Sequence, residues 1–437
     1  MTRFFIVIFA FFALISPAQA GTEIKEVTSP GGIKAWLVEE PSIPFTALEL
    51  RFQGGGSLDR PGKRGAINLM TATIEEGAGD LDAQGFAVAR DELAASFGFD
   101  VNRDALSVSA RFLSENRDEA IALLRTALVS PRFEQDAIDR VREQILSGLR
   151  SDANDPNTAA IIALNTLSYG SHPYATRLDG TIESVSALVR DDVVNAFRDV
   201  VVKDRVFIGA AGDISAEELG QLLDDLLGDL PTGGAPLPSA VDLQLTGGVT
   251  VEDFPVPQAV TLFAHDGIPR DDPDFFPAFL ANEIFGGSGL QSRLSQEVRE
   301  ERGLTYGIGS FLVNSDHSSM VMGQFATANS RVSEAIDVIR DEWQQIASEG
   351  VTPEELEDAK TYLTGAYPLR FDSNASIARI LVGMQLDGLP IDYIDTRNDK
   401  VNAVTLDDVK RVAERLYRAD DLRFVVVGQP EGVENVN

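Results

Sequence analysis

The sequence contains no cysteine and only three histidines among its 437 residues. Without cysteine the chain has no disulfide bonds, no thiolate metal ligands and no thiol nucleophile. The histidines are His172, His265 and His317. No two of them have the i, i+3 or i, i+4 spacing that places two ligands on one helix face. The sequence therefore predicts no zinc site on a helix.

The residues that nucleotide and serine hydrolase chemistry need are also missing. The glycine-rich stretches 54–57 and 286–289 have neither the lysine of a phosphate-binding loop nor the spacing of a dinucleotide site. No Gly-x-Ser-x-Gly elbow occurs. Positive charge is scarce, with 37 Lys and Arg against 68 Asp and Glu and a net charge of −31. Such a chain would repel a phosphate backbone, so we expect no nucleic acid partner, whereas basic peptides could be attracted.

Beyond residue 20, no segment is long and apolar enough to cross a bilayer. Residues 1–20 have one basic residue, an apolar run from Phe4 to Ile15, and small residues at Ala18 and Ala20. This pattern is typical of a cleavable signal peptide, with Gly21 as the first mature residue. We expect export to the periplasm and no membrane association after cleavage.

The predicted elements occur twice in the same order: strands, two helices, a hairpin, several helices and a closing strand. At an offset of 216, the segment from Glu183 lies over the segment from Asp399, and Gly212 lies over Gly428. The repeat predicts an α+β fold of two homologous domains, each a mixed, mostly antiparallel sheet packed against helices. We place these domains at residues 21–229 and 249–437, with 230–248 as a Gly- and Pro-rich linker.

The most informative segment is 283–310. It begins with a glycine-rich turn, in which φ can be positive and the backbone can approach another chain closely: Gly286, Gly287, Ser288 and Gly289. The spacing of apolar residues then predicts a helix from Leu290 to Arg302, which Gly303 ends. A strand is expected to begin near Tyr306. Arg299 and Tyr306 could therefore converge on one peptide carbonyl or carboxylate.

This segment resembles the C-terminal half of the pitrilysin and insulinase-type zinc peptidases, the inverzincin group, which includes the mitochondrial processing peptidase. In that family a helix runs into a Gly-Leu-x-Tyr strand, and an Arg–Tyr pair seven residues apart holds the substrate backbone. Arg299 and Tyr306 occupy those positions. The alternative is an arginine at a helix end that pairs with a glutamate, and a tyrosine packed in a sheet.

The resemblance also shows which groups are missing. Catalytic members carry H-x-x-E-H on the first helix of the first domain and a glutamate ligand further along the chain. Aligned on Gly65, those positions hold the following residues: Asn68, Thr71, Ala72 and, near the third ligand, Gly148. Glu75 and Glu76 lie nearby, but without imidazole such carboxylates are usually solvated. We expect no metal in this chain.

The resemblance thus implies a non-catalytic, substrate-binding subunit of a periplasmic heterodimeric zinc endopeptidase that acts on unstructured peptides. A homologous partner would supply the zinc, Arg299 and Tyr306 would hold the substrate beside it, and Gly286–Gly289 would contact the peptide. Two alternatives remain. One is a structural scaffold, like the core subunits of the mitochondrial cytochrome bc complex, and the other is an inactive homodimer that binds or chaperones peptides.

Overall fold

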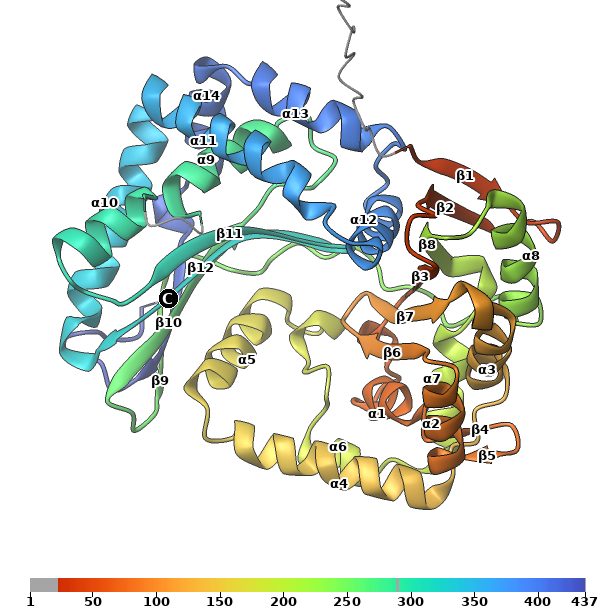
Figure 1. The fold of residues 1–437 in the computed structure, drawn as a ribbon. Coiled ribbons are helices and arrows are strands. Elements are labelled where there is room, and N and C mark those ends of the chain that lie inside the picture. The colour runs from red at the N-terminus through yellow and green to blue at the C-terminus, as the bar shows by residue number, and fades with distance from the viewer. Residues whose placement is uncertain (1–22, 288–290, 437) are drawn as a thin grey trace, which may run out of the picture.

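A computed structural model describes residues 23–287 and 291–436, which form two halves, each built on one β-sheet with helices against it (Figure 1). The strands of the first half are β1 (Lys25–Thr28), β2 (Lys34–Glu39), β3 (Phe45–Gln53), β4 (Gly77–Ala78), β5 (Leu81–Asp82), β6 (Ser96–Val101), β7 (Ala105–Leu113) and β8 (Val206–Gly212). Its helices are α1 (Ala66–Thr73), α2 (Ala83–Glu92), α3 (Arg117–Val129), α4 (Gln135–Asp152), α5 (Pro156–Tyr169), α6 (Ile182–Ser186), α7 (Arg190–Val200) and α8 (Ala216–Leu227).

The second half has the same kinds of element. Its strands are β9 (Gly248–Asp253), β10 (Gln258–Asp266), β11 (Ile308–Ser315), β12 (Ser318–Ala328) and β13 (Arg423–Gly428). Its helices are α9 (Phe275–Gly286), the π-helix η5 (Ser295–Glu301), α10 (Val332–Glu349), α11 (Pro353–Ala366), the short η7 (Tyr367–Arg370), α12 (Asn374–Leu386), α13 (Tyr393–Ala403) and α14 (Leu406–Leu416).

The two sheets share one five-stranded topology, and the first has β1 as an additional edge strand. The first has the strand order β1-β2-β8-β3-β7-β6, and the second, read from β9, has β9-β13-β10-β12-β11. The pairs β2–β8 and β9–β13 are parallel, and the remaining neighbours along both orders are antiparallel. Helix α7 and helix α14 lie 216 positions apart at both ends, 190 to 406 and 200 to 416. The predicted α+β fold with two similar units is confirmed.

Strands β8 and β13 are apolar at almost every position, as expected for strands that are covered on both faces. In β13, Phe424 and Val426 pack into the core of the second half under α9, α10 and α14. The alternate residues Val425 and Val427 face the other side of the sheet. There they meet a helix from the first half.

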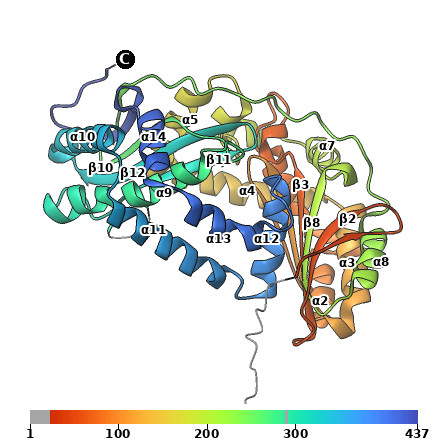
Figure 2. The same cartoon turned by 90° about the horizontal axis from the view of Figure 1, so that it is seen from above.

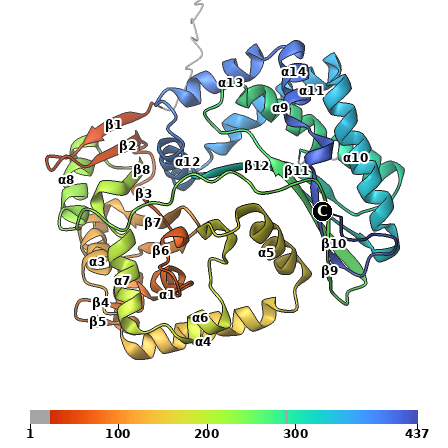
Figure 3. The ribbon, with the colours of Figure 1, turned by 180° about the vertical axis from the view of Figure 1, so that it is seen from behind.

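That helix is α5, and the two halves exchange such helices reciprocally. Residues Ala160 and Leu164 of α5 pack on β10 and β13 of the second sheet. In return, Ala378 and Leu381 of α12 pack on β2, β3 and β8 of the first sheet. Figures 1 and 3 show α12 beside the first sheet and α5 beside the second from opposite sides. The exchange means that neither half has a complete core alone.

One glycine permits the close approach of α12. A Cβ atom added at Gly209 of β8 would lie 2.3 Å from the carbonyl oxygen of Ala378. Two turns further along α12, the Gln385 side-chain amide donates to the Ile208 carbonyl, at 2.8 Å. Backbone-level contact of this kind fixes the position of α12 on the first sheet.

Residues 228–247 contain no helix or strand and cross between the halves (Figure 2). Leu237 packs against the first core, and Val241 and Leu243 pack against the junction beside α5. The domain boundaries around this stretch remain a prediction. Within the described ranges, no helix has the length and apolar character needed to cross a bilayer.

Candidate functional site

The turn at residues 305–307, which follows η5, is held by a buried threonine. The Thr305 hydroxyl donates to the carbonyl of Ala326, at 2.8 Å, and accepts from the Gly307 backbone N–H, at 3.2 Å. The Leu304 N–H donates to the Val298 carbonyl, at 2.9 Å, which ties the turn back to η5. The turn is therefore fixed against β12 and η5.

Tyr306 lies at the centre of this turn and outside the strand. We expected a strand from about Tyr306, but β11 begins at Ile308, because the side chain of Thr305 occupies the hydrogen-bonding groups that a strand would use. The Tyr306 side chain is 89% exposed, more than any other large apolar side chain in the described ranges. A tyrosine packed in a sheet is excluded. Tyrosine is among the residue types enriched at the energetically important positions of binding interfaces, so this exposed ring is a candidate for contact with a ligand or partner.

Arg299 lies in the last part of η5. The expected helix over 290–302 is shorter, with helical residues from 293 to 301, and Leu290 lies outside the described ranges. Gly303 ends it with a φ of 58°, as predicted. The Arg299 Nε atom is 3.5 Å from a Glu300 carboxylate oxygen, and both side chains are partly exposed. Such a pair contributes about 0–1 kcal/mol, so it does not prevent Arg299 from binding another anion or carbonyl.

The π-helical geometry of η5 is itself informative. Single π-helical turns are rare, and they occur often at functional sites. Here the π-helical turn includes Arg299 and leads directly into the turn that carries Tyr306. The roles of these two residues remain a prediction.

The glycines before this segment act by close approach rather than by positive φ. Gly286 is the last residue of α9, and Gly287 has a φ of −58°, so the expected left-handed turn is wrong at these two positions. A Cβ atom at Gly286 would lie 2.2 Å from Ser310 Oγ, because α9 ends against β11. Ser310 Oγ donates to the Asn282 side chain, at 2.8 Å, and closes this contact. Ser288 and Gly289 lie outside the described residues.

Gly286 and Gly287 border a cavity of about 410 Å³. Its other walls include Gly307 of the turn and Phe311 of the edge strand β11, and Phe311 is 41% exposed. The structure thus brings the predicted glycines and the turn after Tyr306 to the same surface. Arg299 and Tyr306 do not themselves line this cavity.

The positions of the missing zinc ligands lie on α1 and α4. Thr71 is buried, and its hydroxyl donates to the Ile67 carbonyl, at 2.8 Å. Ala72 and Gly148 are exposed and have no side chain that can bind a metal, and Asn68 is partly exposed. These residues do not fit a zinc ion.

The carboxylates near α1 are occupied by arginines. Helix α1 ends at Thr73, so Glu75 and Glu76 follow it. Glu75 lies 3.3 Å from Arg90, and Glu76 is bound to Arg140. Among residues 23–287 and 291–436, no group of three or more His, Asp or Glu side chains could hold a metal ion.

The three histidines pack against neighbouring aromatic side chains. The Trp343 indole donates to His265 Nε2, at 3.0 Å, and burial lowers the pKa of His265 to about 4. The rings of His172 and His317 lie 6.2 Å apart at the junction of the halves, where burial lowers the pKa of His172. These contacts use the histidines in packing.

Comparisons with known proteins agree with this arrangement. The profile described as "Peptidase M16 inactive domain" matches residues 187–363. A Helicobacter pylori protein named "Non-peptidase homolog YmxG" is 26% identical over 95% of this chain and 96% of its own length. The probable mitochondrial-processing peptidase subunit beta of Schizosaccharomyces pombe is 23% identical over 94% and 93%. A crystal structure described as a peptidase M16 inactive domain from Pseudomonas fluorescens superposes with a TM-score of 0.88. It is 27% identical and covers 95% of this chain and 100% of its own.

The fold and the altered zinc positions define a non-catalytic relative of zinc peptidases. Residues 187–363 match the inactive domain of the M16 peptidases, and the chain as a whole is similar in sequence and fold to members of that family named as non-peptidase or inactive. The resemblance inferred from residues 283–310 is therefore confirmed.

Sequence reasoning missed the residues that position the site. Thr305 and the Asn282–Ser310 pair hold Tyr306 and Gly286 in place, yet each is a small polar residue in an ordinary context. The one available signal was Thr305 directly before the tyrosine, since Thr side chains often bind nearby backbone groups in turns.

Proposed function

We propose that this chain is the substrate-binding subunit of a periplasmic heterodimeric zinc endopeptidase, and that a homologous partner provides the zinc. The observation that carries the proposal is Tyr306, which is almost fully exposed on a fixed turn in a chain that has lost its own metal ligands. Arg299 lies seven positions before Tyr306 in the sequence and forms only a partly exposed ion pair with Glu300, at 3.5 Å. A relative named as a subunit of a processing peptidase supports assembly with a partner.

In this proposal the chain binds an unstructured peptide and does not cleave it alone. Arg299 and Tyr306 donate hydrogen bonds to a substrate carbonyl, and the surface around Gly286 and Gly287 contacts the peptide backbone. Donors aimed at a carbonyl that develops negative charge accelerate cleavage even when the nucleophile is on another chain. The net charge of −31 favours basic peptides.

The test combines this chain with a homologous chain from the same genome that has an intact H-x-x-E-H motif. Arg299→Ala and Tyr306→Phe should each lower kcat per assembled dimer by roughly 30- to 1000-fold, which corresponds to about 2–4 kcal/mol. Each variant should melt like the unchanged chain and still bind the partner, because neither side chain is buried.

Two exposed residues provide matched controls. Tyr362→Phe alters a tyrosine that is 56% exposed on α11, and Arg302→Ala alters an arginine that forms an ion pair with Glu297. Both should keep full turnover. Unchanged kcat for Arg299→Ala and Tyr306→Phe would refute the substrate-binding role and favour a structural scaffold. Failure of the two chains to form a complex would refute the proposed heterodimer.

A further inference from the structure

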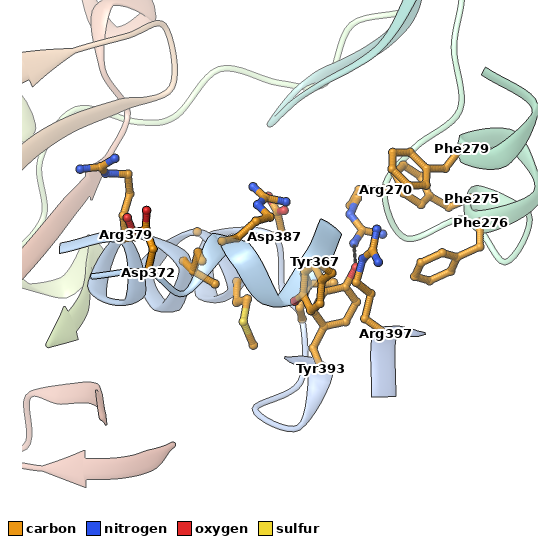
Figure 4. A pocket seen from close by; sticks show the side chains of 16 residues that line it. Arg270, Phe275, Phe276, Phe279, Tyr367, Asp372, Arg379, Asp387, Tyr393 and Arg397 are labelled. Atoms are coloured by element: carbon orange, nitrogen blue, oxygen red, sulfur yellow. Dashed lines mark hydrogen bonds between the residues drawn. The ribbon is translucent and has the colours of Figure 1, made fainter. Parts of the chain in front are cut away.

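A second cavity, of about 580 Å³, lies in the second half between the start of α9, the short η7, α12 and α13 (Figure 4). None of its lining residues borders the cavity beside Gly286. Its volume is in the range of pockets that enclose a small ligand or a few residues of a peptide. This cavity is separate from the site proposed above.

Positive charge gathers in this cavity although the chain as a whole is strongly acidic. Four arginines and two aspartates line the cavity, so positive charge is in excess there. The aspartates are Asp372 and Asp387, and the arginines are Arg270, Arg370, Arg379 and Arg397. None of the four forms an ion pair with a carboxylate of residues 23–287 or 291–436, whereas most arginines of this chain do. An excess of unpaired guanidinium groups favours an anion.

Arg397 is the most constrained of the four. Its side chain is buried, with 6% of its surface exposed, and its guanidinium lies 4.3 Å from the ring centre of Tyr367. Its Nη1 donates to the Leu363 carbonyl, at 3.1 Å, and to the Asn398 side chain, at 2.9 Å. Burial lowers the pKa of Arg397, and the positive charge of Arg370 lowers it further. Keeping a buried cation without a counter-ion costs stability, which a bound anion would recover.

Arg270 is held beside it by aromatic rings. Its guanidinium lies 4.1 Å from the ring centre of Phe275, and its Nη2 donates to the Tyr393 hydroxyl, at 2.6 Å. Figure 4 shows Arg270, Arg397, Tyr367 and Tyr393 gathered at one end of the cavity, with Phe275 and Phe279 beside them. Stacking fixes the plane of a guanidinium and leaves its other donors for a carboxylate.

The first half provides an internal comparison. A hollow lined by α4, α5, α6 and the strand β9 of the second half has a single arginine, Arg177. Arg177 forms ion pairs with Asp152 and Asp179, each at 2.6 Å. That arginine is neutralised within the chain, whereas the four arginines of the second cavity have no carboxylate partner among the described residues.

We propose that this cavity binds a carboxylate carried on an apolar body, the chemistry shared by the last residue of a peptide and a free aromatic acid. Arg270 and Arg370 bind the carboxylate, and the phenylalanines at the start of α9 contact the apolar body. The proposal does not depend on a zinc-bearing partner.

The experiment is isothermal titration of the whole mature chain with four probes. They are N-acetylphenylalanine, its C-terminal amide, acetate, and a short peptide that ends in leucine and phenylalanine with a free carboxylate. The acid should bind at least about tenfold more tightly than the amide, because a hydrogen-bonded ion pair is lost. Acetate should bind more weakly than the acid, since it lacks the apolar body.

Variants locate the binding. Arg270→Gln and Arg370→Gln should each weaken binding of the acid by about tenfold or more. Arg198→Gln removes the same charge from an exposed position on α7 and should leave binding unchanged. Thermal melts confirm that the variants fold, and Arg397 is left intact because it is buried.

The result also identifies the source of the carboxylate. Tighter binding of the peptide than of N-acetylphenylalanine assigns the cavity to peptide C-termini, and equal affinity assigns it to a single terminal residue or free acid. The proposal is overturned if the acid and the amide bind equally, if neither binds at millimolar concentration, or if Arg198→Gln weakens binding as much as Arg370→Gln.

Discussion

Replacing Leu381 by alanine tests whether the two halves unfold as one unit. Leu381 belongs to α12 of the second half, is fully buried, and packs against Val38, Ala47 and Ala211 of the first sheet. A buried Leu→Ala change costs about 2–5 kcal/mol, and we expect about 3 kcal/mol here. With an m-value of at least about 3 kcal/mol per molar urea, the unfolding midpoint should fall by roughly 1 M or less.

The two tryptophans allow each half to be followed separately. Trp36 packs against the cluster around Leu381, and Trp343 lies in the core of the second half. Urea unfolding is followed by fluorescence in the unchanged chain and in Trp36→Phe, which leaves Trp343 as the only indole. If the exchanged helices couple the halves, Leu381→Ala lowers both midpoints equally.

A matched control is Leu369→Ala, since that leucine is 76% exposed and its loss should change stability by less than about 0.5 kcal/mol. The reasoning is refuted if Leu381→Ala lowers the midpoint in the chain with both tryptophans and leaves the midpoint in Trp36→Phe, which Trp343 reports, where it was. Two separate transitions in the unchanged chain would refute it as well.

Three further outcomes are expected. The pKa of His265 is about 4 in the folded chain against an ordinary 6.5, so protons bind the unfolded state first and stability falls by up to about 3 kcal/mol from pH 6.5 to 4. His265→Gln should remove this dependence of the unfolding free energy on pH. The variant and the unchanged chain are compared at each pH, because both contain Asp59, whose pKa burial raises to about 6 and whose effect on stability has the opposite sign. Gly286→Ala places a methyl group 2.2 Å from Ser310 Oγ and should cost about 1–3 kcal/mol in urea unfolding, with faster hydrogen exchange in β11. Tyr306→Phe should change the melting temperature by no more than the error of the scan, because the ring is exposed.

The repeat and most elements could be predicted because they rest on local periodicity. Helix α14 and strand β13 follow their apolar spacing, and their counterparts in the first half do so too. Helix α8 was missed although Ser215 and Glu218 form a capping box that is readable in the sequence. Helix α13 had no such signal. Its buried stripe passes through Arg397, and a buried arginine breaks the apolar pattern.

The exchange of α5 and α12 could not be predicted, because an apolar helix face does not specify which sheet it covers. The same limit applied to the candidate site. The residue types in 283–310 were sufficient to indicate Arg299 and Tyr306, but the exposure of Tyr306 depends on bonds from Thr305 to a strand more than twenty positions away. The cavity around Arg270 and Arg397 is assembled from separate helices, and no local pattern relates them.

The reciprocal placement of α5 and α12 has the geometry of domain swapping within one polypeptide. Two identical chains, each equal to one half, would reach the same packing if each gave its corresponding helix to the other. A tandem duplication joined through residues 230–248 would then turn such a swapped dimer into a single chain without altering any contact between the halves. After that step the two copies are free to diverge, and one sign of this divergence is that Arg397 lies at the position of Thr181 in the first copy.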